Sequence, residues 1–138
     1  MAERKPGEYG YEDTSFRAMG GEAGIRTLVD HFYDLMDTLP EAARIRAMHK
    51  QDLSEARDKL AAFLCGWLGG PKRYSERWGP IRIPKAHAHL GIVEQDADAW
   101  MLCMTQAAAK VDITDDFRAY FLREIRVPAN RIVQAGRG

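Results

Sequence analysis

The feature that most constrains the fold is the run FLCGWLGGP at residues 63–71, where an apolar segment ends at two glycines and a proline. Glycine is common just after the last turn of a helix, and proline cannot continue the helical hydrogen bonds. We therefore predict a helix with N-cap Asp52 that ends at Gly69-Gly70-Pro71 and has Phe63 and Trp67 on its apolar side. Other elements must cover that side, because an apolar helix face is stable only when it is buried.

Most of the remaining chain shows the same helical spacing of apolar residues, and no stretch keeps the alternation of a β-strand for long. The predicted fold class is therefore all-α. Further helices are expected from Thr14-Ser15 to Gly20-Gly21, along residues 25–36, through 42–48, from about 94 to 110, and from Thr114 or Asp115 onward. Pro128 should break the last of these and leave a short helical tail with Ile132 and Val133. Residues 71–92 should form a loop with at most a short helix around His87.

Composition limits the function classes. A chain of 138 residues is most simply one domain, here residues 14–138, after a polar, loose extension at residues 1–13. The apolar share of 46% and the charged share of 29% are typical of a soluble globular protein. A formal net charge of zero gives no general reason to bind nucleic acid or an anionic membrane. No apolar run is long enough to span a bilayer and the start lacks a signal core, so we expect a cytoplasmic location.

The two cysteines, Cys65 and Cys103, are too few and too far apart for a metal-binding cysteine motif. Both fall on apolar helical stretches. We predict that they are buried free thiols that the protein does not need for function.

Two histidines in the 71–92 segment, His87 and His89, are candidates for binding a metal such as haem iron through an imidazole nitrogen. A histidine in a loop is more often structural, and the periodicity does not choose between the two. Tyr33 and Trp100 lie on apolar helical stripes, where each is either a core residue or a hydrogen-bond donor directed into a cavity. His49 follows a short helix and would ordinarily be solvated.

A basic segment surrounds Tyr74 and Trp78 and contains Lys72, Arg73, Arg77, Arg82 and Lys85. It is either a solvated loop or a set of cationic partners for carboxylates, such as the propionates of a haem.

Taken together and in order, several of these residues resemble the truncated, two-over-two haemoglobins, and the resemblance covers roughly residues 18–127. The residues that carry it are Phe32-Tyr33, Asp52-Leu53, Phe63-Leu64, Gly69-Gly70-Pro71, Tyr74, His87, Trp100 and Cys103-Met104. Trp100 and the WLGGP run point to group II of that family. The resemblance implies a short, globin-like helical sandwich around haem b.

By position, the resemblance implies that His87 is the iron ligand, with Tyr33, Trp100 and His49 stabilising a ligand on the distal side. Met48 is the alternative to His49 at that corner. Ala56 stands where vertebrate globins place a distal histidine, and Lys85 would replace the arginine that many members have beside the iron ligand. The implied haem contacts are Phe32, Met48, Ala56, Lys59, Leu60, Phe63, Leu64, Tyr74, Arg82, Lys85, Ile92 and Met104.

The function that the resemblance implies is reversible binding of dioxygen, carbon monoxide and nitric oxide at a five-coordinate iron, with slow oxygen release. No catalytic residue is assigned. A haem enzyme of the nitric oxide dioxygenase or peroxidase kind is the alternative, and a haem-free helical interaction module is a third interpretation. The resemblance leaves open a reductase partner and a homodimer.

Overall fold

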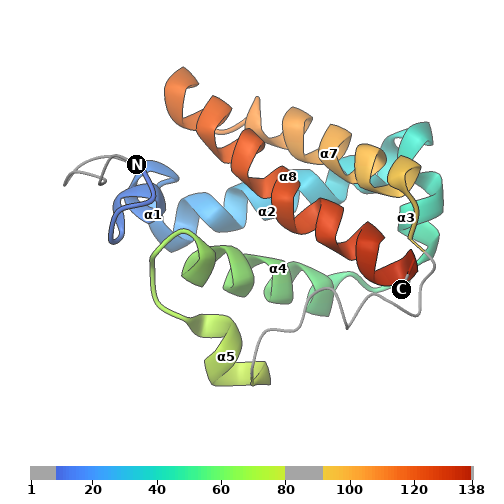
Figure 1. Cartoon of the computed structure of the whole chain (residues 1–138), viewed down its shortest axis with the longest axis horizontal. Helices are drawn as coiled ribbons and strands as arrows, with labels where there is room; N and C mark the ends of the chain where they lie inside the picture. The colour runs from blue at the N-terminus through green and yellow to red at the C-terminus, as the bar shows by residue number, and fades with distance from the viewer. Residues whose placement is uncertain (1–8, 80–91, 138) are drawn as a thin grey trace.

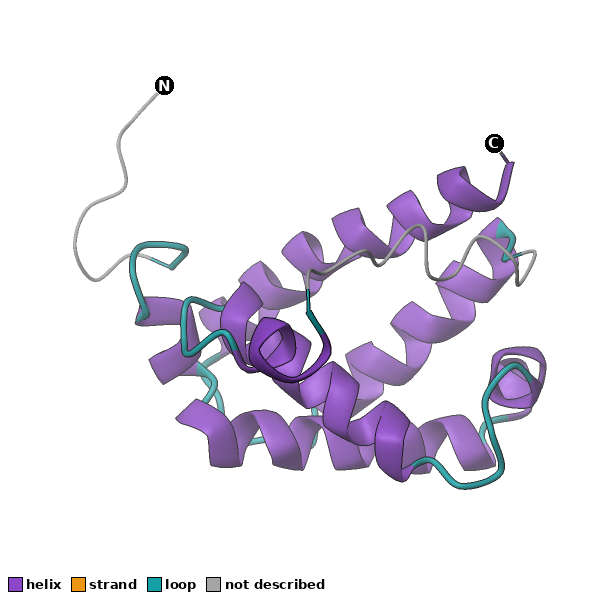
Figure 2. Cartoon of the chain, turned by 90° about the horizontal axis from the view of Figure 1, so that it is seen from below, coloured by secondary structure: helices purple, strands orange, loops and turns teal. Residues whose placement is uncertain are grey.

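The computed structural model describes residues 9–79 and 92–137, with side chains as far as residue 131. This part of the chain is helical and contains no strand (Figures 1 and 2), which confirms the all-α prediction. The elements in order are α1 (Thr14–Ala18), α2 (Gly21–Thr38), the 3-10 helix η1 (Pro40–Ala42), α3 (Ala43–Ala47), α4 (Ser54–Trp67), α5 (Arg73–Trp78), α7 (Glu94–Ala108) and α8 (Asp115–Arg137).

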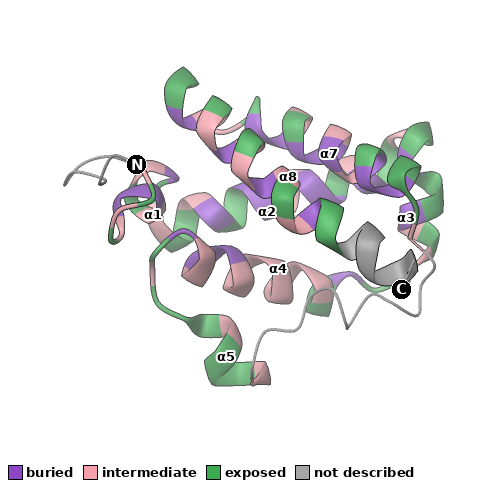
Figure 3. Cartoon of the chain, in the orientation of Figure 1, coloured by how far each residue is buried: buried purple, intermediate pink, exposed green. Residues whose placement is uncertain are grey.

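Four long helices form the body as two pairs, with α2 packed on α4 and α7 packed on α8 (Figure 1). The pairs are joined because α2 also packs on α7. Buried residues follow the facing sides of these helices (Figure 3), at the three- and four-residue steps expected from the sequence. The largest fully buried side chains of these four helices include Phe32 on α2, Leu64 on α4, Met104 on α7, and Phe117 and Phe121 on α8.

The predicted stop after α4 is confirmed. Gly69 adopts a left-handed φ of +96°, and the N–H of Gly70 donates to the carbonyl oxygen of Cys65 at 2.8 Å. This arrangement satisfies carbonyl groups that the helix end would leave unpaired. The N–H of Phe16 also donates to the carbonyl oxygen of Leu68 at 2.9 Å, so the stop holds α1 against α4. At the other end, Asp52 accepts hydrogen bonds from the N–H and the hydroxyl of Ser54, although the N-cap is Leu53 rather than Asp52 as predicted.

Two sequence predictions about helices are wrong. Residues 73–78 form α5 rather than loop, and no residue of α5 is buried. Six residues without a buried face give no apolar period for sequence reasoning to detect. Pro128 lies inside α8, which continues past it to Arg137. Proline in a helix costs about 3 kcal/mol in general, but the buried stripe of Phe117, Phe121, Ile125 and Ala129 extends to both sides of Pro128, and its packing holds the helix together.

Residues 9–13, the described part of the extension, contact α8 through Tyr9. The Tyr9 ring centroid lies 5.0 Å from that of Phe117 and 5.2 Å from that of Tyr120. Cys65 and Cys103 are both buried and free, as predicted. Across residues 9–79 and 92–137, no helix combines the length and the apolar character needed to cross a membrane.

The helix stop yields a stability prediction. An alanine at position 69 must adopt a positive φ, and its Cβ would also collide with the carbonyl oxygen of Glu12. Gly69→Ala should lower the free energy of unfolding by about 2–4 kcal/mol. Gly21→Ala is the matched control, because Gly21 has a φ of +70° and its Cβ would meet only an ordinary contact with Phe16. It should cost about 1–2 kcal/mol. Urea denaturation measures both, and equal losses would contradict the collision with Glu12.

Candidate functional site

A cavity of about 380 Å³ lies among the long helices, and most of its walls are apolar. It is lined from α2, from α3 and the loop after it, from α4 and α5, and from α7 and α8. The lining residues are Tyr33, Ile45, Met48, His49, Ala56, Lys59, Leu60, Phe63, Tyr74, Ile92, Asp96, Ala97, Trp100, Ile125, Pro128 and Ala129. A cavity of this kind, with few polar groups among apolar ones, is the usual form of a small-molecule or cofactor site.

Tyr33 projects from α2 and is only 5% exposed. Its ring packs edge-on against Phe32 and His49, with centroids 4.9 and 5.8 Å apart. Burial raises the pKa of the Tyr33 hydroxyl far above its usual value, and the nearby charge of Arg57 opposes part of that rise. Tyr33 therefore keeps its proton at any ordinary pH and remains a hydrogen-bond donor.

Trp100 lies on α7, with its ring centroid 5.0 Å from that of Phe32. Within the described residues, no acceptor receives a hydrogen bond from the Trp100 indole N–H or the Tyr33 hydroxyl. No buried side-chain nitrogen or oxygen in this part of the protein lacks a partner, so both groups face open cavity space rather than packed side chains. The cavity thus holds two donors that are ready for a polar ligand.

His49 lines the same end of the cavity, where its Nδ1 lies 2.8 Å from the carbonyl oxygen of Ile45. A carbonyl oxygen can only accept, so Nδ1 carries the proton in this bond. Neutral His49 then has an acceptor, not a donor, at Nε2, and it can donate from Nε2 only in its protonated form.

The opposite rim carries Lys59 and Tyr74. The Lys59 ammonium lies 2.9 Å from a carboxylate oxygen of Glu55 and 5.8 Å from the Trp78 ring centroid. The hydrogen bond from Lys59 is the main reason that the pKa of Glu55 lies below its usual value. Tyr74 stacks at a tilt on Trp78, with centroids 5.3 Å apart. A cation and a phenol therefore stand where the apolar cavity meets α4 and α5.

The structure brings ten of the sequence-predicted site residues to the cavity wall, and both candidates for the distal corner, Met48 and His49, are among them. These ten are Tyr33, Met48, His49, Ala56, Lys59, Leu60, Phe63, Tyr74, Ile92 and Trp100. Phe32, Leu64 and Met104 are instead fully buried in the core. Arg82, Lys85, His87 and its rival His89 lie outside the described residues, so the iron ligand stays a prediction.

Sequence reasoning missed six lining residues: Ile45, Asp96, Ala97, Ile125, Pro128 and Ala129. Ile125 follows Phe117 and Phe121 at four-residue steps, and this helical spacing could have placed it. Asp96 gave no such signal. It is 3% exposed, receives a hydrogen bond at 2.8 Å from the Arg44 guanidinium, and accepts another at 3.0 Å from the N–H of Val93. Its partner Arg44 is distant in the sequence, and only the folded chain brings the two together. Among the described residues, no three histidine, cysteine or acidic side chains gather as a metal site.

The chain is similar to known proteins in both sequence and structure. A family model described as bacterial-like globin matches residues 14–132. The chain is 30% identical over 113 residues to the group 2 truncated hemoglobin YjbI of Bacillus subtilis, covering 82% of this chain and 83% of that protein.

Solved structures agree. The group II 2-on-2 hemoglobin of Agrobacterium tumefaciens matches with a TM-score of 0.82 and 33% identity over 96% of this chain and 97% of that one. The group II truncated hemoglobin of Bacillus anthracis matches with a TM-score of 0.81 and 29% identity over 94% and 93% of the two chains. The helical fold thus has the architecture of these proteins, and the chain belongs to the bacterial-like globin family as a group II truncated haemoglobin.

Proposed function

We propose that this protein binds haem b in the 380 Å³ cavity and uses it to bind dioxygen, carbon monoxide and nitric oxide reversibly, with slow release of dioxygen. The observation that supports the proposal most is the pairing of apolar walls with two donors, Tyr33 and Trp100, that lack acceptors within the described residues. A ligand that filled the cavity without accepting from these two donors would leave both of them unsatisfied, so a ligand with a polar acceptor atom is favoured.

The lining residues fit haem chemically. A porphyrin is flat and apolar, which suits walls such as Leu60, Phe63 and Ile125. Its two propionates need cationic or hydroxyl partners, and Lys59 and Tyr74 offer these at the rim. His87 would hold the iron, and Lys85 and Arg82 are further candidates for the propionates.

When bound, haem supplies an iron with one position open to a diatomic ligand. The side chains that line the cavity would determine which ligand stays bound. Tyr33 and Trp100 donate hydrogen bonds to a polar ligand, and His49 adds one when it is protonated. Dioxygen would be a better hydrogen-bond acceptor in this site than carbon monoxide, so these donors would favour dioxygen. Each such bond contributes roughly 1.5–3 kcal/mol, or about ten- to a hundredfold in affinity.

A second candidate, peroxidase-like or nitric oxide dioxygenase activity, is favoured by one observation. His49 lines the cavity beside Tyr33, where a histidine could move a proton to or from a substrate. The third interpretation, a haem-free interaction module, would leave the two donors without acceptors. An absorption spectrum of the purified protein separates haem binding from this third interpretation, because only a haem protein has a Soret band.

The first functional prediction concerns the iron ligand. His87→Ala should abolish stable haem retention, or at least the ferrous spectrum typical of a histidine ligand, because it removes the nitrogen that is expected to hold the iron. His89→Ala is the matched control and should keep both. Haem content and ferrous spectra of the two purified variants measure this. Loss of haem from His89→Ala alone would assign the ligand to His89 instead.

The second prediction concerns Trp100. Trp100→Phe keeps an aromatic ring but removes the indole donor, so dioxygen release should become about tenfold faster. Carbon monoxide release should change much less, because carbon monoxide is a poor acceptor. Stopped-flow release and association rates are measured for both gases, since the smaller ring could also widen the path to the cavity. Equal changes for the two gases would assign a steric role to Trp100.

The third prediction is a pH dependence. Because burial raises the pKa of Tyr33, its hydroxyl keeps its proton above the pH at which a solvated tyrosine loses it. The ratio of dioxygen release rates between Tyr33→Phe and the wild type should therefore stay constant from about pH 8 to pH 10. A ratio that falls toward one over this range would show that Tyr33 ionises there and stops donating.

A further inference from the structure

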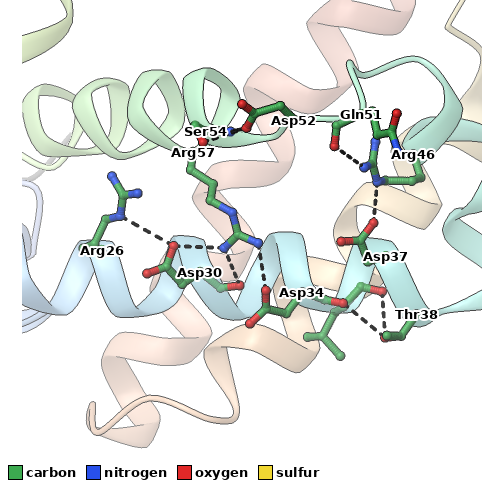
Figure 4. Close-up of polar contacts among 11 residues, drawn as sticks. Arg26, Asp30, Asp34, Asp37, Thr38, Arg46, Gln51, Asp52, Ser54 and Arg57 are labelled. Carbon is green, nitrogen blue, oxygen red and sulfur yellow. Dashed lines mark hydrogen bonds and ion pairs between the residues drawn. The ribbon is translucent and has the colours of Figure 1, made fainter.

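Arg57 extends from α4 to the outer side of α2, where its guanidinium donates hydrogen bonds to two carboxylates (Figure 4). One of its terminal nitrogens donates to the Asp30 carboxylate at 2.9 Å and to the Asp30 backbone carbonyl at 3.2 Å. The other donates to the Asp34 carboxylate at 2.8 Å. The Arg57 side chain is only 20% exposed. A planar guanidinium with three acceptors in place has little freedom to move.

These hydrogen bonds lie directly beside Tyr33, because on α2 Asp30 lies one turn before Tyr33 and Asp34 lies one residue after it. The guanidinium carbon of Arg57 lies 5.8 Å from the centroid of the Tyr33 ring. Phe32 and His49 pack against the same ring. Arg57 does not line the cavity, although its neighbour Ala56 does. Arg57 therefore contacts the Tyr33 ring but does not line the cavity in which a ligand would bind.

Arg57 is also a dependable cation. Burial would lower its pKa, but the hydrogen bonds to Asp34 and Asp30 outweigh burial and raise it. Its charge acts on the Tyr33 hydroxyl in the opposite direction to burial and favours a more acidic phenol. A more acidic phenol is a stronger hydrogen-bond donor, and a cation beside an aromatic ring is attracted to it.

We propose that Arg57 is a positioning residue that holds the Tyr33 ring in the cavity wall and strengthens its hydroxyl as a donor to the bound ligand. The inference rests on the proposed function, because it requires that Tyr33 donates to a ligand. A residue outside the cavity would thus help to set the rate of dioxygen release.

The chain provides a matched control in Arg26. This arginine pairs with Asp30 on its own helix at 3.5 Å and with Asp58 on α4 at 2.7 Å. Its side chain is 45% exposed, and it makes no cation–π contact with Tyr33 among the described residues. Loss of Arg26 therefore removes ion pairs from the same interface, including one to the Asp30 carboxylate that Arg57 also uses. The Arg57 hydrogen bond to Asp34 and the contact of Arg57 with Tyr33 stay in place.

The test measures gas release from the haem-loaded protein after its spectrum has confirmed haem binding. Arg57→Met should speed dioxygen release about threefold and leave carbon monoxide release nearly unchanged. It should also shift the C–O stretching frequency of the carbon monoxide complex, which responds to the donors in the pocket. Arg57→Lys keeps the positive charge but loses the planar guanidinium that donates to both carboxylates. Its rate of dioxygen release should therefore lie between those of the wild type and Arg57→Met. Arg26→Met should match the wild type in all three readouts.

A double-mutant cycle with Tyr33→Phe distinguishes a specific role from a general one. If Arg57 acts through Tyr33, Arg57→Met should have no further effect on dioxygen release in the Tyr33→Phe background. Full additivity there would overturn the inference, and so would an effect of Arg26→Met equal to that of Arg57→Met. Because Arg57→Lys retains the charge, it extends the same test if Arg57→Met does not fold.

The outcomes also separate this inference from the proposed function. Absence of a Soret band from the wild-type protein overturns the proposed function. A Tyr33→Phe variant with faster dioxygen release, combined with an Arg57→Met variant that behaves like the wild type, overturns only the role of Arg57.

Discussion

The contact between Phe32 and the two rings beside it is the interaction on which the core and the cavity both depend. Phe32 is fully buried, and its ring lies 4.9 Å from that of Tyr33 on its own helix and 5.0 Å from that of Trp100 on α7. Burying a phenylalanine contributes about 1.5–3 kcal/mol, and replacing one by alanine costs about 3–5 kcal/mol. The same contact sets the spacing between the two donors. Packing that stabilises the fold therefore also determines the geometry of the site.

This arrangement includes two polar groups that the packing of the fold does not require. Tyr33 and Trp100 both line the cavity, and no acceptor meets the Tyr33 hydroxyl or the Trp100 indole N–H within the described part of the chain. A ligand that filled the cavity and left such a donor without an acceptor would cost roughly 1–3 kcal/mol for each donor. For folding alone, phenylalanine at either position would pack almost as well. The retention of two polar groups in an otherwise apolar wall is thus better explained by a ligand than by folding.

Sequence reasoning predicted the features that follow from local patterns. The apolar stripes located the long helices, the glycines located the end of α4, and the apolar setting of Cys65 and Cys103 indicated their burial. Sequence reasoning failed where contacts between residues distant in the sequence determine the structure. Packing on both sides of Pro128 carries α8 through a residue that should end it, and α5 has no buried face to signal it. The pair of Arg44 and buried Asp96 was equally out of reach, because nothing in the sequence links two residues so far apart.

The outer face of α2 shows how such long-range contacts act on the cavity. Arg57 holds the helix beside Tyr33, and Arg46 pairs with Asp37 one turn further along (Figure 4). Arg46 also donates to the carbonyl oxygens of Lys50 at 3.0 Å and Gln51 at 2.9 Å, and so fixes the loop that carries His49. Partly exposed ion pairs of this kind contribute about 0–1 kcal/mol to stability. Their larger effect is positional. A hydrogen bond weakens steeply when its distance or angle departs from the optimum, so a small shift of α2 or of this loop changes ligand binding more than it changes folding. The contacts of Arg57 and Arg46 with the polar face of α2 therefore belong to the site as much as the apolar face does, although neither arginine lines the cavity.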